Sequence, residues 1–149
     1  MKKLLLVIAL AITTQFGFAQ ETTFKQDVIK FFEATGSSLN MISDQILPMI
    51  DEADHENFKK DFSVLVDDFY TKVTEVFQEE LTQEDVKSLV AIIEKAKTDQ
   101  SDNMAELIQA SEAGKKFAEK EKIIDEKMQN KLMTWSLDLQ LMMSRYGIE

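Results

Sequence analysis

The sequence predicts an all-α fold: a single-domain bundle of about five or six helices with a long C-terminal helix. Three observations favour this class. Glycine and proline are scarce, with four and one respectively in 149 residues, which disfavours a fold rich in turns. Apolar residues recur every three to four positions over long stretches, as in helices that bury one face. No alternation of the strand type persists for more than a few residues.

The first 19 residues have the layout of a secretory signal peptide. A positive segment, an apolar run and two small residues at positions −3 and −1 of a cleavage site follow in order: Lys2 and Lys3, Leu4 to Ile12, Gly17 and Ala19. We therefore expect residues 1–19 to be removed, leaving a helical domain over residues 20–149 that is periplasmic or secreted. Because the apolar run is much shorter than the roughly 20 residues of a spanning helix, no membrane anchor is expected after cleavage.

Three helices are predicted in the first half of the domain. The first runs from about Phe24 to Ala34, and Gly36 can end it in a left-handed conformation. The second begins near Leu39, and Pro48 should kink or end it because proline lacks the N–H donor. After a polar connection over residues 51–56, the third helix has the clearest apolar stripe, formed by Phe58, Phe62, Leu65, Phe69, Val73 and Val76.

The sequence of the second half of the domain predicts three more helices. Thr82 resembles an N-cap for the fourth, because two acidic residues follow it in the positive first turn. A loop over residues 98–103 leads to a short fifth helix from Met104. The last helix runs from Glu112 to about Ser144. Its core stripe is Ile124, Met128, Leu132, Trp135, Leu139 and Met142.

This last helix carries a second set of apolar side chains on an adjoining face. The set is Met133, Leu137 and Leu141, with Met143 beyond. Two interpretations stay open. The helix can be central in the bundle and covered on several sides, or this surface can receive a partner, either an unknown envelope protein or a small apolar ligand, because flexible thioether side chains adapt to varied surfaces.

Several segments resemble a family of secreted bacterial helical proteins described as domain of unknown function 2059. The segments are Asp44 to Pro48, Leu81 to Val86, Ser111 to Phe117, Met128-Gln129 and Trp135. The resemblance implies a periplasmic or secreted helical domain. It implies no reaction, since the family has no assigned one.

The chain departs from the family pattern in three places. Ile92 and Ile93 stand where the family has a Phe-Tyr pair, and Glu112 replaces a proline. The segment from Glu94 to Ala110 resembles an insertion between two motif halves that are normally adjacent.

Motifs that would indicate chemistry are weak. His55 is the single histidine and cysteine is absent, whereas zinc sites usually need several such ligands, so an exposed polar linker is the expectation at His55. Asp99, Ser101 and Asn103 match the start of a calcium loop, but Met104 stands where such a loop needs glycine. We expect no metal, no cofactor and no catalytic residues.

The formal net charge of −10 at pH 7 opposes binding to nucleic acid and to anionic membranes. It also favours solubility and discourages self-association. The leading hypothesis is an exported, non-catalytic binding or interaction module of the bacterial cell envelope. The alternatives are a carrier of a small apolar ligand held between helices and a carboxylate-dependent hydrolase whose acidic pair is assembled by folding.

Overall fold

The computed structural model describes residues 23–37, 39–99 and 103–148. The predicted signal peptide, cleavage site and Ser101 lie outside this part of the chain. The described residues form six α-helices, two short 3-10 helices and no strand, which confirms the predicted all-α class. The α-helices span residues 23–35, Leu39–Ile46 (α2), His55–Glu80 (α3), Gln83–Thr98 (α4), Met104–Ala110 (α5) and Glu112–Arg145 (α6).

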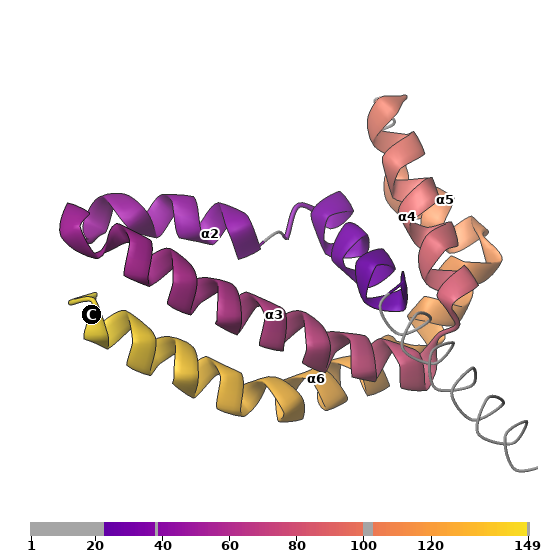
Figure 1. The fold of residues 1–149 in the computed structure, drawn as a ribbon. Helices are drawn as coiled ribbons and strands as arrows, with labels where there is room; N and C mark the ends of the chain where they lie inside the picture. Colours follow the sequence, from indigo (N-terminus) through magenta and orange to yellow (C-terminus); the bar gives the residue numbers. More distant parts are fainter. Residues whose placement is uncertain (1–22, 38, 100–102, 149) are drawn as a thin grey trace, which may run out of the picture.

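The two longest helices, α3 and α6, lie side by side and antiparallel, and form the frame of the molecule (Figure 1). The helix over 23–35 and α2 lie on the other side of α3 from α6 (Figure 1). This arrangement explains the strong apolar stripe of α3, because that helix is packed between neighbours and buries Phe58, Phe62, Phe69, Val73 and Val76. The α6 helix is at the edge of the molecule, so only one of its faces is packed.

The larger core cluster joins the helix over 23–35 to α3, α4 and α6. Its centre is aromatic: the Phe31 ring lies 5.6 Å from Phe77 and 5.8 Å from Phe117, and the Phe32 ring lies 5.8 Å from Phe69, measured between ring centroids. Val28 in the first of these helices is fully buried. Aromatic pairs at these distances add stabilisation beyond the area that they bury.

A smaller core cluster closes the opposite end of the α3–α6 pair. Phe58 stacks on Phe62 with ring centroids 5.5 Å apart, and Tyr146 meets Phe58 edge-on at 5.3 Å. Ile50 and Met142 complete the buried part of the cluster. The segment just before α3 therefore packs against the C-terminal end of α6.

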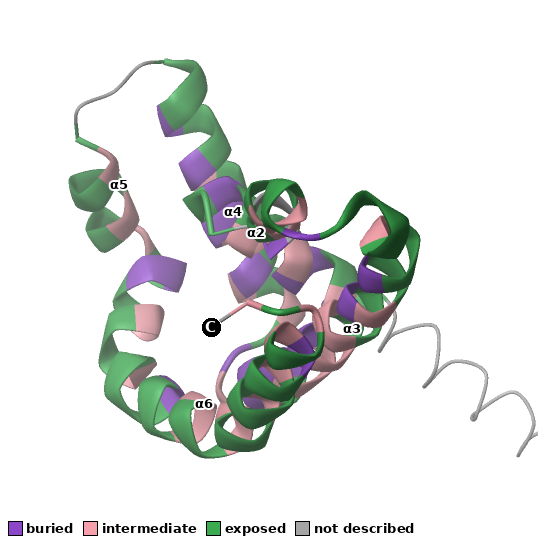
Figure 2. Ribbon diagram, turned by 90° about the vertical axis from the view of Figure 1, so that its left-hand side faces the viewer, coloured by how far each residue is buried: buried purple, intermediate pink, exposed green. Residues whose placement is uncertain are grey.

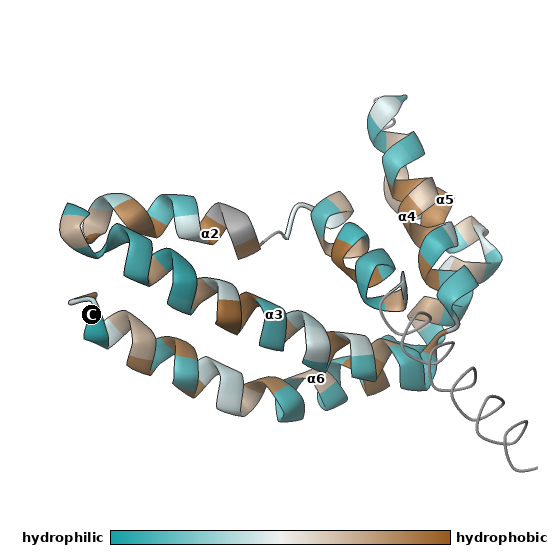
Figure 3. Ribbon diagram, viewed as in Figure 1, coloured by the Kyte–Doolittle hydropathy of each residue, from teal (hydrophilic) through white to brown (hydrophobic). Residues whose placement is uncertain are grey.

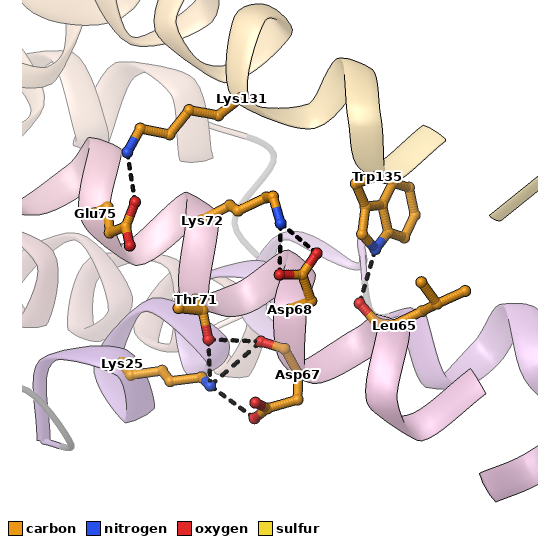
Figure 4. A network of polar contacts seen from close by, with 9 residues as sticks. All are labelled: Lys25, Leu65, Asp67, Asp68, Thr71, Lys72, Glu75, Lys131 and Trp135. Atoms are coloured by element: carbon orange, nitrogen blue, oxygen red, sulfur yellow. Dashed lines mark hydrogen bonds and ion pairs between the residues drawn. The ribbon is translucent and has the colours of Figure 1, made fainter. Parts of the chain in front are cut away.

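Ion pairs run along one flank of the α3–α6 contact and continue to α4. Lys131 pairs with Glu75, Lys127 with Glu79 at 2.7 Å and with Glu80, Lys120 with Glu80 at 3.2 Å, and Lys116 with Asp85. Successive lysines along α6 thus meet successive carboxylates in the reverse order along the chain, as an antiparallel pair requires. Figure 4 shows the Lys131 pair together with the contacts of Lys25, which holds the helix over 23–35 to Asp67 and Thr71 of α3.

The helices α4 and α5 lie against each other and project away from the α3–α6 frame as an arm (Figures 1 and 2). The base of the arm is a tight turn. Ser111 caps α6 by accepting a hydrogen bond from the Gly114 amide at 2.9 Å, and its hydroxyl donates to the Ile108 carbonyl at 2.7 Å. A Cβ atom at Gly114 would lie 1.7 Å from that carbonyl oxygen, so only glycine fits there.

The structure confirms most predicted helix ends and corrects others. Gly36 ends the first described helix with φ +80°, and Pro48 converts the end of α2 into the 3-10 helix Leu47–Met49. Thr82 caps α4 in a capping box with Asp85. The polar connection predicted over 51–56 is shorter than expected, because it contains the 3-10 helix Glu52–Asp54 and α3 already begins at His55. The predicted loop over 98–103 also starts later, since Thr98 still belongs to α4.

Candidate functional site

The predicted surface on the last helix forms an exposed row of three side chains. Met133, Leu137 and Leu141 are 64%, 55% and 67% exposed. They follow one another at intervals of four residues, so they share one face of α6. This face is opposite to the core stripe, whose ends Ile124 and Met142 are buried. The alternative that α6 is covered on several sides is therefore wrong for this half of the helix.

Met143 does not belong to this row. Its side chain is half-buried and packs against the smaller core cluster. It also lines a surface hollow of about 400 Å³ with Leu139, Gln140, Ser144 and Ile148. The hollow is largely apolar but open to solvent, so a ligand bound there would lie on the surface of the bundle. The four residues predicted to form one surface are therefore separated: Met133, Leu137 and Leu141 form the outward row, and Met143 lines the hollow.

Val64 of α3 extends the exposed apolar surface beyond α6. It is 65% exposed and lies with Leu141 in a shallow groove of about 300 Å³ between the two helices. The groove is bordered by Asp138 and by Asp61, which accepts hydrogen bonds from Arg145 at 3.0 Å and from Tyr146 at 2.9 Å. Val64 was missed at the sequence level because it lies next to core residues in α3, and a single valine off the apolar stripe gives no pattern.

Trp135 holds the row in place from the inner side of α6. Its Nε1 donates a hydrogen bond to the Leu65 carbonyl oxygen at 2.7 Å, and its ring lies 5.1 Å from the Phe69 ring (Figure 4). Most of the indole is buried, and it packs against the larger core cluster, in agreement with the expectation of a largely buried tryptophan. The expected neighbour is confirmed, because Trp135 does pack on α3.

Figure 3 shows brown, tan and pale residues predominating along the C-terminal half of α6, with few teal ones between them. The sequence explains this, because Lys131 and Asp138 are the only charged residues from Gln129 to Ser144, whereas the helix is densely charged from Glu112 to Lys127. Lys131 is engaged with Glu75 of α3. The outward face of α6 therefore changes from charged to nearly neutral at its midpoint.

Among the described carboxylates, Asp27 is buried and accepts a hydrogen bond from the Gln83 amide at 2.7 Å. The partly buried Glu80 and Asp85 are held by lysines. A hydrogen bond from Lys127, followed by one from Lys120, keeps the pKa of Glu80 below its usual value. Burial raises the pKa of Asp85, but hydrogen bonds from Lys116 and Thr82 outweigh that effect and the pKa lies below its usual value. An acid–base pair needs two carboxyl groups whose pKa values are driven apart. These two are driven in the same direction, as in structural ion pairs.

His55 is placed differently from the exposed linker expected for it. It is half-buried in the first turn of α3, and its Nε2 lies 3.1 Å from the Ile50 carbonyl oxygen. Within the described part of the chain, no group of three or more His, Cys, Asp or Glu side chains is placed to hold a metal ion. Of the calcium-loop residues, Asn103 directly precedes α5, and Ser101 lies outside the described residues. The contact between His55 and the Ile50 carbonyl oxygen therefore belongs to the first turn of α3.

Comparisons with protein-family models, curated proteins and solved structures give no match for this chain. The resemblance to domain of unknown function 2059 therefore stays a prediction. Among the described helices, none is both long enough and apolar enough to cross a membrane.

Proposed function

We propose that this protein is an exported, non-catalytic interaction module of the bacterial cell envelope, periplasmic or secreted, which binds through the outward row of Met133, Leu137 and Leu141. The observation that carries the proposal is the exposure of these three side chains on one face of α6. Burying three such side chains against a partner would contribute several kcal/mol of favourable transfer free energy, at about 1.5–3 kcal/mol each.

Two further features support a binding role over a catalytic one. Glu80 and Asp85 pair with lysines across helix contacts, and the buried Asp27 accepts a hydrogen bond from the Gln83 amide of α4. Such contacts stabilise an arrangement of helices. The segments that resemble domain of unknown function 2059 also have structural tasks here, since Ser111 caps α6 and Thr82 caps α4. That family resemblance, which we retain as part of the proposal, implies an exported helical domain and no reaction.

A second function, the carrying of a small apolar ligand, is favoured by one specific observation. The hollow lined by Leu139, Met143 and Ile148 presents mainly apolar surface in about 400 Å³, which is within the range of small-molecule sites. A ligand held there would contact the smaller core cluster and would be independent of the outward row.

Export is tested by N-terminal sequencing of the mature protein from its own host. The signal-peptide layout of residues 1–19 predicts a chain that begins at Gln20. Recovery of the uncleaved chain in the cytoplasm would contradict this part of the proposal.

Binding is tested by placing a photo-crosslinking amino acid at Leu137 in the host, with the same group at Ile123 as the matched control. Ile123 is 41% exposed on the same helix but lies outside the row. We expect a protein adduct at position 137 and none at position 123. Native mass spectrometry of the purified protein separates the alternative, because a carrier would retain a small molecule. If neither a protein adduct nor a ligand is found, the binding role is wrong.

A further inference from the structure

The series of ion pairs between α3 and α6 is interrupted at one position. Lys131 pairs with Glu75, and Arg145 pairs with Asp61 at 3.0 Å. These two contacts are fourteen residues apart in both helices, so the antiparallel helices keep one register between them. Halfway between the two contacts, the residue of α6 is Asp138. At this step a carboxylate therefore stands where the neighbouring steps of α6 have a cation.

The residue of α3 at the same step is also acidic. Asp68 lies halfway between Glu75 and Asp61, so the register places it opposite Asp138. Asp68 already has a cation, because Lys72, one turn along α3, donates to both of its carboxylate oxygens (Figure 4). The carboxylate of Asp138 is exposed, and no described residue forms a hydrogen bond or an ion pair with it. This step of the series therefore has one negative charge in excess.

The unpaired carboxylate lies beside the exposed apolar surface. Asp138 lines the groove between α3 and α6 together with Val64 and Leu141, and Leu141 is also the last residue of the outward row. The carboxylate thus lies at the border between the row and the groove. Amphipathic helices bind in apolar grooves through side chains three or four residues apart. A helix of this kind fits here if it has a lysine or arginine beside its apolar stripe.

The charges on the groove indicate the sign of the partner. Asp61 is already neutralised by Arg145, so the excess charge at the groove is that of Asp138. The net charge of −10 attracts a basic partner and repels an acidic one, including a second copy of the chain. Complementary charges at the edge of an interface also fix its register. Both the local excess and the overall charge therefore favour a cationic partner.

We propose that the outward row and the adjoining groove bind a basic amphipathic helix of another protein, with a lysine or arginine of that helix paired to Asp138. This inference rests on the proposed binding role of the row, and it names the chemistry of the partner. The partner's cation supplies the charge that the series of ion pairs lacks at this step. The apolar residues of the partner cover the exposed side chains Met133, Leu137, Leu141 and Val64.

Two fluorescently labelled helical peptides test the charge selection by fluorescence anisotropy. Both have leucines every three or four positions, and one has lysines beside the leucines where the other has glutamates. We expect the protein to bind the lysine peptide, and to bind the glutamate peptide at least about tenfold more weakly, because like charges would meet at the groove. Leu137→Glu should abolish binding of the lysine peptide. Equal binding of the two peptides would overturn the cationic partner.

Asp138→Asn separates a specific ion pair from general attraction by the net charge. The matched control is Asp125→Asn, which removes the same charge at an exposed position in the other half of α6. We expect Asp138→Asn to weaken binding of the lysine peptide about threefold, and Asp125→Asn to leave it nearly unchanged. The difference should decrease at high salt, which screens exposed charges. Equal losses in both variants would attribute the attraction to net charge and overturn the assigned contact.

Asp138→Lys distinguishes a binding role of this residue from a structural one. The substitution opposes the partner's cation, so it should abolish binding of the lysine peptide. It also continues the series of cations along α6, so the melting temperature should be unchanged or higher. A lower melting temperature would show that Asp138 stabilises the fold, and would overturn its assignment to a partner.

Failure of this inference and failure of the binding role give different results. A lysine peptide that does not bind overturns the basic partner, whereas the binding role still stands if a protein adduct forms at position 137 in the host. An adduct with a segment that has no lysine or arginine near the crosslink, or with a second copy of the chain, has the same consequence. If no peptide binds and neither an adduct nor a ligand is found, both proposals are wrong.

Discussion

Lys116 in α6 forms an ion pair with Asp85 in α4, and so joins two chain segments that are separated by the whole α4–α5 arm. Asp85 is also the residue that completes the capping box of α4, accepting hydrogen bonds from the Thr82 amide at 2.8 Å and from its hydroxyl at 2.6 Å. The two segments are those that resemble adjacent motif halves in the family pattern. The structure brings them together at the base of the arm, although 94–110 separates them in sequence.

Replacing Asp85 should therefore remove two kinds of stabilisation at once. We expect Asp85→Ala to lower the free energy of unfolding by about 1–2 kcal/mol, mainly through loss of the cap, with a smaller part from the half-exposed ion pair. Chemical denaturation measures the change. Combined with Lys116→Ala in a double-mutant cycle, the coupling between the two residues should be positive. Additive effects of the two substitutions would contradict a direct interaction.

Gly114 is expected to be the least tolerant glycine among the described residues. Gly114→Ala would drive a Cβ atom against the Ile108 carbonyl oxygen, which belongs to the backbone and cannot move aside without opening the α5–α6 turn. Overpacking of this kind costs about 1–3 kcal/mol or more. Gly36→Ala is the control, because it has open space around it and only the cost of a left-handed residue, about 1–2 kcal/mol. A smaller loss at Gly114 than at Gly36, in thermal or denaturant melts, would show that the turn adapts.

The ion pairs along α6 predict acid sensitivity. Hydrogen bonding from Lys127 holds the pKa of Glu79 and of Glu80 below the usual value. A carboxylate whose pKa is lower in the folded than in the unfolded state stabilises the fold. This contribution is complete above the unfolded pKa, about 4.3 for glutamate, and is lost as the pH falls through the folded pKa. The free energy of unfolding should thus be constant between about pH 5 and neutrality and should decrease below about pH 4.

The charge-neutral variant Glu80→Gln tests the origin of this acid sensitivity. It should be less stable than the wild type at pH 7 and should lose less stability on acidification. Glu121→Gln, at an exposed position of α6, is the matched control and should keep the pH profile of the wild type. Equal flattening of the profile in both variants would attribute the effect to net charge rather than to the Lys127 contacts.

Much of the fold could be predicted from the sequence because its signals are local. The stripe of α3, the cap at Thr82 and the stop at Gly36 each depend on residues within one or two turns, and the structure has all three. The contact between Gly114 and Ile108 could not be predicted, because nothing in the sequence indicates that α6 turns back on α5. The partition of the apolar residues on α6 also depends on tertiary packing, since Met143 is covered by the smaller core cluster and Leu141 is not.

Trp135 tests how much the contact between α3 and α6 contributes to stability. Truncation of a buried tryptophan to alanine costs about 3–5 kcal/mol, and most of this indole is buried against α3. We expect Trp135→Ala to cost an amount near the lower end of that range, because part of the ring is exposed. Trp135→Phe should keep the contact with Phe69 and lose only the hydrogen bond to the Leu65 carbonyl, about 1 kcal/mol.

Because Trp135 is the single tryptophan, its fluorescence reports this environment directly. The emission maximum should lie between the values for buried and water-exposed indole. An emission maximum at the value of water-exposed indole would contradict the contacts of Trp135 with the Phe69 ring and the Leu65 carbonyl oxygen.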